Sequence, residues 1–454
     1  MCGGHRPAGR PRLVRRGSVP SGDTRSGHHL DGRAPRILAH AIGTVDGKRY
    51  RWVLVGVSAT VNSLAWSVRS TFAVFYVALL AEFGWRRGEA TLGYSFSWLL
   101  LLVFSPLAGW LYDRWGARVV VPAGGLILGV ALALTGQVTT RWHYYLAFGV
   151  LGGAGIAFIQ VPAAAIVSRW FLRSRGAAMG VISAGASASA IVFYPMNTYL
   201  IAAFGWRAAF AIFGLLVAAV TIPLAAFVYR EPPEPGDGRR EVTVDRQPGT
   251  TDEWTLGRAL CSTPFWAVFA MWGFGVIGYQ IMTTHQVAHA LERGFSAVTL
   301  GWVFGLGGAC TVAGNVIGGS LSDRWGRERV FALGSAIGIA GIGSLAWLDG
   351  PEDLLSLLGY VVAGVGFGMR ISLLTAIPAD IFAGRNLGVI LGAAQGGGGV
   401  GGLIGPFLGG WLFDVTGSYL IAFAVAALAI AVSAVAAWVA APRRAREASH
   451  AIAR

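Results

Sequence analysis

The chain has 454 residues, of which 54% are hydrophobic and 13% are charged. Soluble proteins carry charge on about a quarter of their residues, so this composition excludes an ordinary soluble domain. The formal net charge of +14 would favour a nucleic-acid partner in a soluble chain, but the arginines follow a pattern, described below, that marks membrane topology instead. We therefore expect a lipid bilayer, and no nucleic acid, as a partner.

Residues 1–50 are rich in Arg, Gly, Pro, Ser and His and show no apolar periodicity. No run in this segment matches the apolar core of a secretory signal peptide. The sequence predicts a disordered basic tail here, on the cytoplasmic side of the membrane.

Twelve apolar spans follow, each of about 20 residues or more, which is enough for a helix to cross a hydrocarbon core of about 30 Å. They cover residues 52–80, 90–112, 119–139, 143–168, 175–200, 207–228, 264–288, 298–320, 330–349, 354–378, 387–411 and 418–441. The pattern predicts an all-α membrane protein with twelve transmembrane helices in two pseudo-symmetric six-helix bundles. The expected parts are bundles at 51–229 and 263–441, a cytoplasmic linker at 230–262 and a cytoplasmic tail at 442–454.

Two similar charged loops separate apolar spans, GWLYDRWGAR at 109–118 and GSLSDRWGRER at 319–329. Their aspartates are 210 residues apart, about half the chain, which indicates an internal repeat. We expect the first glycine of each loop to allow close approach of a neighbouring helix and the second to permit the turn. The predicted gating-loop residues are Gly109, Asp113, Arg114, Gly116, Arg118, Gly319, Asp323, Arg324 and Gly326.

The arginines set the expected orientation. With both termini in the cytoplasm, 29 of the 36 Lys and Arg residues lie on the cytoplasmic side and five lie outside. This asymmetry satisfies the positive-inside rule, so the sequence predicts a multi-pass integral membrane protein with both termini cytoplasmic.

The two loops resemble the signature G-x-L-x-D-R-x-G-x-R of the major facilitator superfamily, and the second copy departs from it only at Glu328. The opening of the fifth span, RWFLRSRGAAMGVISAGASAS (169–189), resembles the signature of the monocarboxylate-transporter family, as do EFGW (82–85) and FDVTGSY (413–419) in its bacterial members. The resemblance implies a transporter of the bacterial inner membrane whose spans 1, 4, 7 and 10 line a central cavity. It also implies an Asp and an Arg within span 8, and this chain has neither between Thr299 and Ser320.

Two arginines lie near the middle of apolar spans, Arg69 in the first and Arg370 in the tenth, while no span has an Asp or Glu in its interior. A mid-span Arg costs about 2.5–3.5 kcal/mol on the insertion scale, so each should have a partner. One hypothesis is that both cations bind an anionic ligand between the halves. The alternative is that each Arg bonds backbone carbonyls and braces two helices.

Polar side chains recur on the same spans. Asn62, Arg69 and Tyr76 are seven residues apart, which would place them on one face of a continuous helix. The seventh span carries a similar stripe, and the fourth carries a single amide that could equally bond another helix. The predicted substrate-binding residues are Arg69, Arg370, Asn62, Tyr76, Gln160, Tyr279 and Gln286.

His285 and His289 lie one turn apart near the outer end of the seventh span. They lack the further ligands of a metal site, so we expect no metal and no cofactor. A partly exposed pair at the cavity mouth is the favoured interpretation, with His285 as the candidate proton carrier.

These features predict a secondary active transporter that moves a small organic anion, with a monocarboxylate preferred, by alternating access of its two halves. Protons are the candidate coupling ion. Two alternatives remain open, an anion exchanger of the oxalate–formate type and a sensor that binds without translocating. No nucleophile–base or metal constellation points to an enzyme.

Overall fold

A computed structural model describes residues 47–171, 175–231, 254–382 and 386–440 of the chain. The described residues from Lys48 onward form one compact unit. The expected tails lie outside the described residues except at positions 47–50, which are already helical. The expected linker is described only at its two ends, where residues 256–260 form a short helix.

The described residues form helices and connecting turns. In chain order the helices are α2 (Gly47–Ser70), α3 (Phe72–Phe83), α4 (Arg87–Trp115), α5 (Ala117–Thr135), α6 (Arg141–Tyr144), the π-helical η1 (Tyr145–Gly152), α7 (Gly153–Trp170), α8 (Arg175–Val228), α9 (Leu256–Leu260), α10 (Thr263–Glu292), α11 (Ala297–Trp325), α12 (Arg327–Ala346), α13 (Leu354–Ile381), α14 (Leu387–Thr416) and α15 (Tyr419–Ala440).

The predicted spans all fall on these helices. Ten helical segments of the described chain are long and apolar enough to cross a membrane. One of them holds two spans, because α8 bends at Gly205, whose φ of 76° is left-handed. These ten segments therefore contain eleven spans. The 30-residue helix α14 adds one more, which makes twelve, as the sequence predicts.

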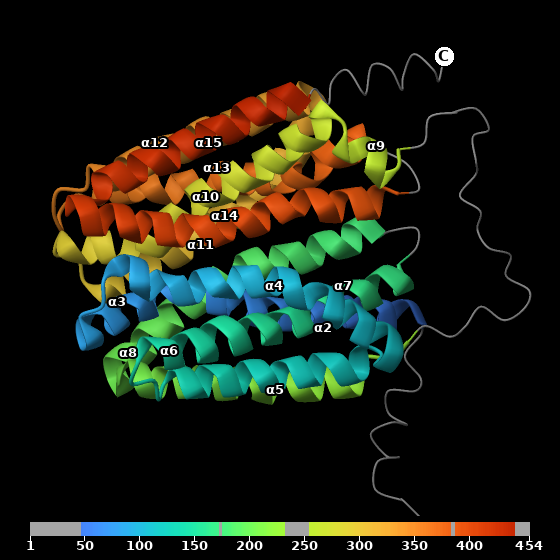
Figure 1. The fold of residues 1–454 in the computed structure, drawn as a ribbon, viewed down its shortest axis with the longest axis horizontal. Coiled ribbons are helices and arrows are strands. Elements are labelled where there is room, and N and C mark those ends of the chain that lie inside the picture. Colours follow the sequence, from blue (N-terminus) through green and yellow to red (C-terminus); the bar gives the residue numbers. More distant parts are fainter. Residues whose placement is uncertain (1–46, 172–174, 232–253, 383–385, 441–454) are drawn as a thin grey trace, which may run out of the picture. The chain divides into compact units, whose positions relative to one another are not determined.

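The helices form two groups. Figure 1 shows α2 to α8, coloured blue to green, on one side, and α10 to α15, coloured yellow to red, on the other. Within the first group α5 packs against α7 and α8, and within the second α10 packs against α14 and α15. The groups meet chiefly along two seams, α4 against α14 and α8 against α11, and α3 also contacts α10.

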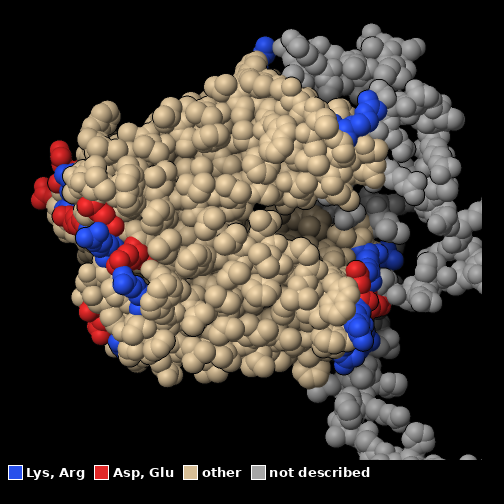
Figure 2. Space-filling model, viewed as in Figure 1, with Lys and Arg blue, Asp and Glu red and all other residues tan. Residues whose placement is uncertain are grey.

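The surface of this helical unit is apolar between two charged ends. Figure 2 shows the Lys, Arg, Asp and Glu side chains of the viewed face at the two ends and none in the broad band between them. Large apolar side chains such as Leu215 and Leu355 are 70% and 81% exposed. Such a surface is unfavourable in water and suits the hydrocarbon core of a bilayer.

The two halves touch more closely at one end than at the other. We call the end with the turns at Gly116 and Gly326 the signature end, and the end where α4 begins at Arg87 the far end. Along the α4–α14 seam, contacts run from Gly88 at the far end to Leu102, which lies past the middle of α4. At the signature end, on the side of α9 in Figure 1, the surface in Figure 2 is hollowed between the groups. The structure is therefore closed at the far end and open at the signature end.

Candidate functional site

The first span is interrupted at its centre. Residue Thr71 leaves helical geometry with φ −95° and ψ 2°, and its hydroxyl donates to the Ser67 carbonyl at 2.7 Å. The Asn197 side chain of α8 donates to the same hydroxyl at 2.9 Å. Hydroxyl side chains that bond back to the preceding turn compete with the helical ladder. The prediction of one continuous helical face for Asn62, Arg69 and Tyr76 is therefore wrong, because α3 starts a new helix after the break.

Arg69 lies at the end of α2, next to this break, and its side chain is buried. Its Nη2 donates to the Ser97 carbonyl of α4 at 3.1 Å, and its Cζ lies 4.0 Å from the ring centroid of Trp98. Its Nε and Nη1 have no hydrogen-bond partner among the described residues. A buried guanidinium with two nitrogens whose N–H groups lack partners can donate hydrogen bonds to a carboxylate.

Arg370 of α13 has a different environment, within the C-terminal half. Its Nη2 donates to the Ser433 hydroxyl of α15 at 2.9 Å, and its Cζ lies 5.0 Å from the Phe331 ring of α12. Ser433 in turn donates to the Met271 carbonyl of α10 at 2.6 Å. The guanidinium groups of Arg370 and Arg69 have no contact residue in common among the described residues, and Nε of Arg370, like that of Arg69, has no hydrogen-bond partner there.

The remaining polar candidates are spread over both halves. Asn62 donates to the Ile182 carbonyl of α8 at 3.4 Å, so it joins two helices. Gln160 is half-buried, and its Nε2 has no partner among the described residues. The half-buried Tyr279 packs edge-on against Phe367 of α13, with ring centroids 5.4 Å apart.

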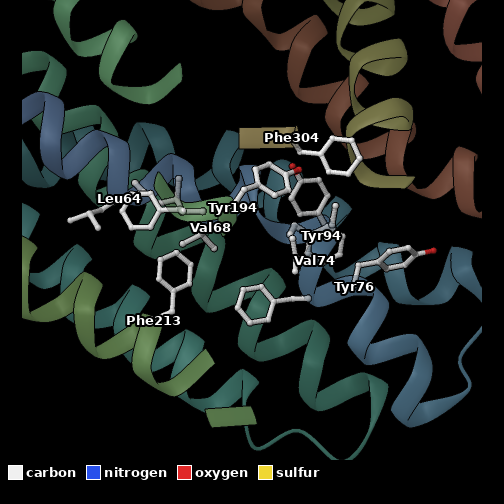
Figure 3. Close-up of a cluster of buried hydrophobic side chains, with 14 of the residues drawn as sticks. Leu64, Val68, Val74, Tyr76, Tyr94, Tyr194, Phe213 and Phe304 are labelled. Atoms are coloured by element: carbon white, nitrogen blue, oxygen red, sulfur yellow. The ribbon is translucent and has the colours of Figure 1, made fainter. Parts of the chain in front are cut away.

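The side chains of two glutamines of α10 form hydrogen bonds to the other half. Gln280 donates to the Tyr94 hydroxyl of α4 at 2.9 Å, and Gln286 donates to the Tyr194 hydroxyl of α8 at 3.0 Å. In Figure 3 Tyr94 and Tyr194 lie near Phe304 of α11, whereas Tyr76 points away from them. Gln286 was a predicted site residue, but Gln280 and the two tyrosines were not, because each bond joins residues at least 92 positions apart.

A charged cluster closes the far end. The backbone N–H groups of Arg87 and Gly88, at the start of α4, donate to the Asp414 carboxylate of α14 at 2.9 and 2.8 Å. The Arg87 side chain also bonds Glu292 of α10 and the Tyr419 hydroxyl of α15. A carboxylate at a helix N-terminus is favoured by the helix dipole, so this cluster links one half to three helices of the other.

The two histidines are buried, and the prediction of a partly exposed pair at the cavity mouth is wrong. His285 places Nε2 3.0 Å from the Pro406 carbonyl, and His289 places Nε2 3.0 Å from the Leu345 carbonyl. Both rings pack on Tyr419, which together with α14 covers this part of α10. No group of three or more metal-ligating side chains occurs among the described residues.

The signature loops have the predicted turn but not the predicted helix contact. Gly116 and Gly326 have φ values of 72° and 94°, which confirms that each turn requires glycine. The first glycines do not serve close packing: a Cβ on Gly109 would meet only Val161, at 4.0 Å, and one on Gly319 would meet nothing within 4 Å.

The aspartates of these loops form ion pairs that the sequence did not indicate. Asp113 lies 2.8 Å from Arg169, at the end of α7, and Arg169 also pairs with Glu231 at 3.5 Å. In the second half Asp323 pairs with Arg327 at 2.8 Å, and Arg327 reaches Asp380 of α13 at 3.2 Å. Each loop is thus tied to a helix end within its own half.

Comparisons with known proteins agree with this fold. A family model described as Major Facilitator Superfamily matches residues 55–371 and, in a second segment, residues 286–454. Monocarboxylate transporter 13 of Rattus norvegicus is 28% identical over 395 residues, which cover 86% of this chain and 88% of that protein.

Two further comparisons extend this similarity. Monocarboxylate transporter 11 of Homo sapiens is 27% identical over 410 residues, with 84% of this chain and 80% of that protein covered. Among solved structures, an inward-facing bacterial homologue of the human lysosomal transporter Spinster shares the fold with a TM-score of 0.68 and 15% identity, over 87% of this chain and 97% of that one.

Proposed function

Because the chain belongs to the Major Facilitator Superfamily, we propose that it carries a small organic anion, a monocarboxylate in the first place, across the bacterial inner membrane by alternating access. The observation that carries this proposal is the buried Arg69 guanidinium, whose Nε and Nη1 have no hydrogen-bond partner among the described residues. It lies at a helix break in the first span and beside Trp98, which packs against the other half.

A carboxylate is the ligand class that suits Arg69. The described spans supply no acid to this cation, and a carboxylate could accept charge-assisted hydrogen bonds from the unpartnered nitrogens of Arg69. The similarity to monocarboxylate transporters supports a single charge on the substrate. Exchange of a dicarboxylate would call for a second cation at the same anion, and Arg370 is engaged with Ser433 instead.

The closed far end and the open signature end support alternating access. With the orientation that the arginines favour, the signature end faces the cytoplasm and this structure is the inward-open state. The opposite state requires the Arg87–Asp414 cluster and the α4–α14 seam to separate while the signature loops come together.

The substrate class is tested by uptake into proteoliposomes. We expect labelled monocarboxylates to enter, dicarboxylates of similar length to enter poorly, and an imposed pH gradient to raise uptake. Equal uptake of both classes would contradict the monocarboxylate assignment and favour the exchanger.

Substitution of Asp113 by Asn should slow transport and leave anion affinity within a few-fold of wild type. The Asp113–Arg169 pair is exposed, so its loss costs at most about 1 kcal/mol of stability, and we propose that it rearranges when the signature end closes. Initial rates and KM of uptake measure this effect, with Asp349→Asn, an exposed acid of a far-end loop, as the control. A collapse of affinity at an unchanged access equilibrium would refute the gating role.

We propose His285 as the proton carrier, and its substitution by Gln should flatten the pH dependence of uptake. Gln can still donate to the Pro406 carbonyl, but it cannot titrate. The side chains packed on the imidazole are Tyr76 of α3 and Tyr419 of α15, and the Arg87 guanidinium, which bonds the Tyr419 hydroxyl, adds a positive charge nearby. His289→Gln is the matched control, and an unchanged profile in His285→Gln would exclude this role.

A further inference from the structure

Trp98 of α4 lies between Arg69 and the opposite half. The Arg69 Cζ is 4.0 Å from the centroid of its ring. On α14, a Cβ placed on Gly402 would lie 2.6 Å from Trp98 Cγ, so the indole occupies the space that a side chain at 402 would need. The ring therefore touches both the buried cation and the seam between the halves.

The indole N–H of Trp98 is a further unsatisfied donor. Its Nε1 is buried and has no hydrogen-bond partner among the described residues, like Nε and Nη1 of Arg69. An indole nitrogen acts only as a hydrogen-bond donor, and the same is true of a guanidinium. These three donor nitrogens belong to two stacked side chains, and a carboxylate has enough acceptor sites to bond Arg69 and the indole N–H at the same time.

We propose that Trp98 is a third donor to the transported anion and that it couples the anion site to the closure of the far end. This inference rests on the proposed function, since it extends the Arg69 site by one residue. The anion bonds Arg69 and the Trp98 N–H together, and the ring of Trp98 holds its position because it rests on the bare backbone of Gly402.

The contact between Trp98 and Gly402 couples anion binding to the closure of the far end. When α4 and α14 separate, Trp98 loses its contact with Gly402, and the third donor is no longer held beside Arg69. The anion then binds more tightly to the state in which the far end is closed than to the state in which it is open. By linkage, anion binding must favour the closed state by the same factor.

The first experiment removes the donor but keeps a ring. We expect Trp98→Phe to raise the Kd for pyruvate, measured by calorimetry on purified protein, about tenfold. The control is Trp110→Phe on the same helix, because Trp110 is 55% exposed on the apolar surface and should leave Kd unchanged.

The second experiment fills the space under the ring. Gly402→Ala should displace Trp98 and push α4 away from α14, whereas Gly399→Ala, nearly one turn earlier, should not, since its Cβ would lie 3.8 Å from Leu102. Spin labels on Trp142→Cys and Trp347→Cys, at far-end loops of opposite halves, report the separation after Cys2, Cys261 and Cys310 are changed to Ser. We expect a longer distance in Gly402→Ala and the wild-type distance in Gly399→Ala.

The wild-type protein provides a measurement that does not depend on how Gly402→Ala folds. Pyruvate should shift the label distances towards the closed far end in wild type and much less in Trp98→Phe. Wild-type affinity and an equal pyruvate response in Trp98→Phe would overturn the inference while the Arg69 site stands. Absence of binding by any short monocarboxylate to wild type would overturn both.

Discussion

Arg69→Gln should weaken monocarboxylate binding by about 1.5–3 kcal/mol, which corresponds to a rise in Kd of roughly tenfold to 150-fold. Glutamine keeps length and polarity at this position but removes the charge that the anion would neutralise. Among the described residues Nε and Nη1 of Arg69 have no partner, so the variant loses the anion contacts, one intramolecular hydrogen bond to the Ser97 carbonyl and the contact with the Trp98 ring. Calorimetric titration of purified, monodisperse protein measures the change.

Two further variants sharpen this result. Arg69→Lys should restore little affinity, because an ammonium lacks the planar fork that bonds both carboxylate oxygens. Arg114→Gln removes an exposed arginine of the first signature loop, whose nearest aromatic neighbour is Trp110, and should bind as wild type does. If Arg69 only braces two helices, Arg69→Gln will instead be poorly folded and bind normally in whatever protein survives.

Ser433→Ala should destabilise the protein by about 1–3 kcal/mol and leave anion affinity unchanged. Ser433 accepts a hydrogen bond from Arg370 and is fully buried, so its removal leaves a second N–H group of a buried cation without a partner. Thermal denaturation in detergent should show a lower Tm in this variant.

The matched control is Ser320→Ala, because the hydroxyl of Ser320 is exposed and bonds only the Val316 carbonyl of its own helix. Arg370→Gln should resemble Ser433→Ala, with lower stability and nearly normal affinity. A large loss of affinity in Arg370→Gln would restore the two-cation site that the sequence suggested.

Most of the fold follows from the sequence because a bilayer tolerates few backbone structures. Long apolar spans must be helical there, and the repeated charged loops locate the two halves. The helices extend beyond the predicted spans, as α10 does to Glu292, because charged residues continue a helix into the interface. The break at Thr71 was not predicted, since it depends on Asn197, which is 126 residues away.

The site was predictable only in part. A mid-span cation stands out in any sequence, so Arg69 and Arg370 were both identified, but the residue that each one contacts depends on how the helices are rotated in the packed bundle. Ser433, which is 63 residues from Arg370, carries no local signal of that contact. Asp414 of α14, which accepts from the first N–H groups of α4, also carries no local signal of that contact, because it lies 327 residues from Arg87. Burial of the histidines also arises from packing, here of α10 against α14 and α15.

The most direct test of a carboxylate carrier compares one carboxylate with its uncharged counterpart. Proteoliposomes containing the wild-type chain, the Arg69→Gln variant or no protein are given labelled pyruvate and, separately, labelled pyruvamide, which is similar in size and shape. We expect wild type to accumulate pyruvate well above protein-free liposomes, Arg69→Gln to lose most of that uptake at low concentration, and pyruvamide to enter all three alike. Uptake of pyruvamide by wild type that matches pyruvate, or pyruvate uptake that is unchanged in Arg69→Gln, would contradict the account.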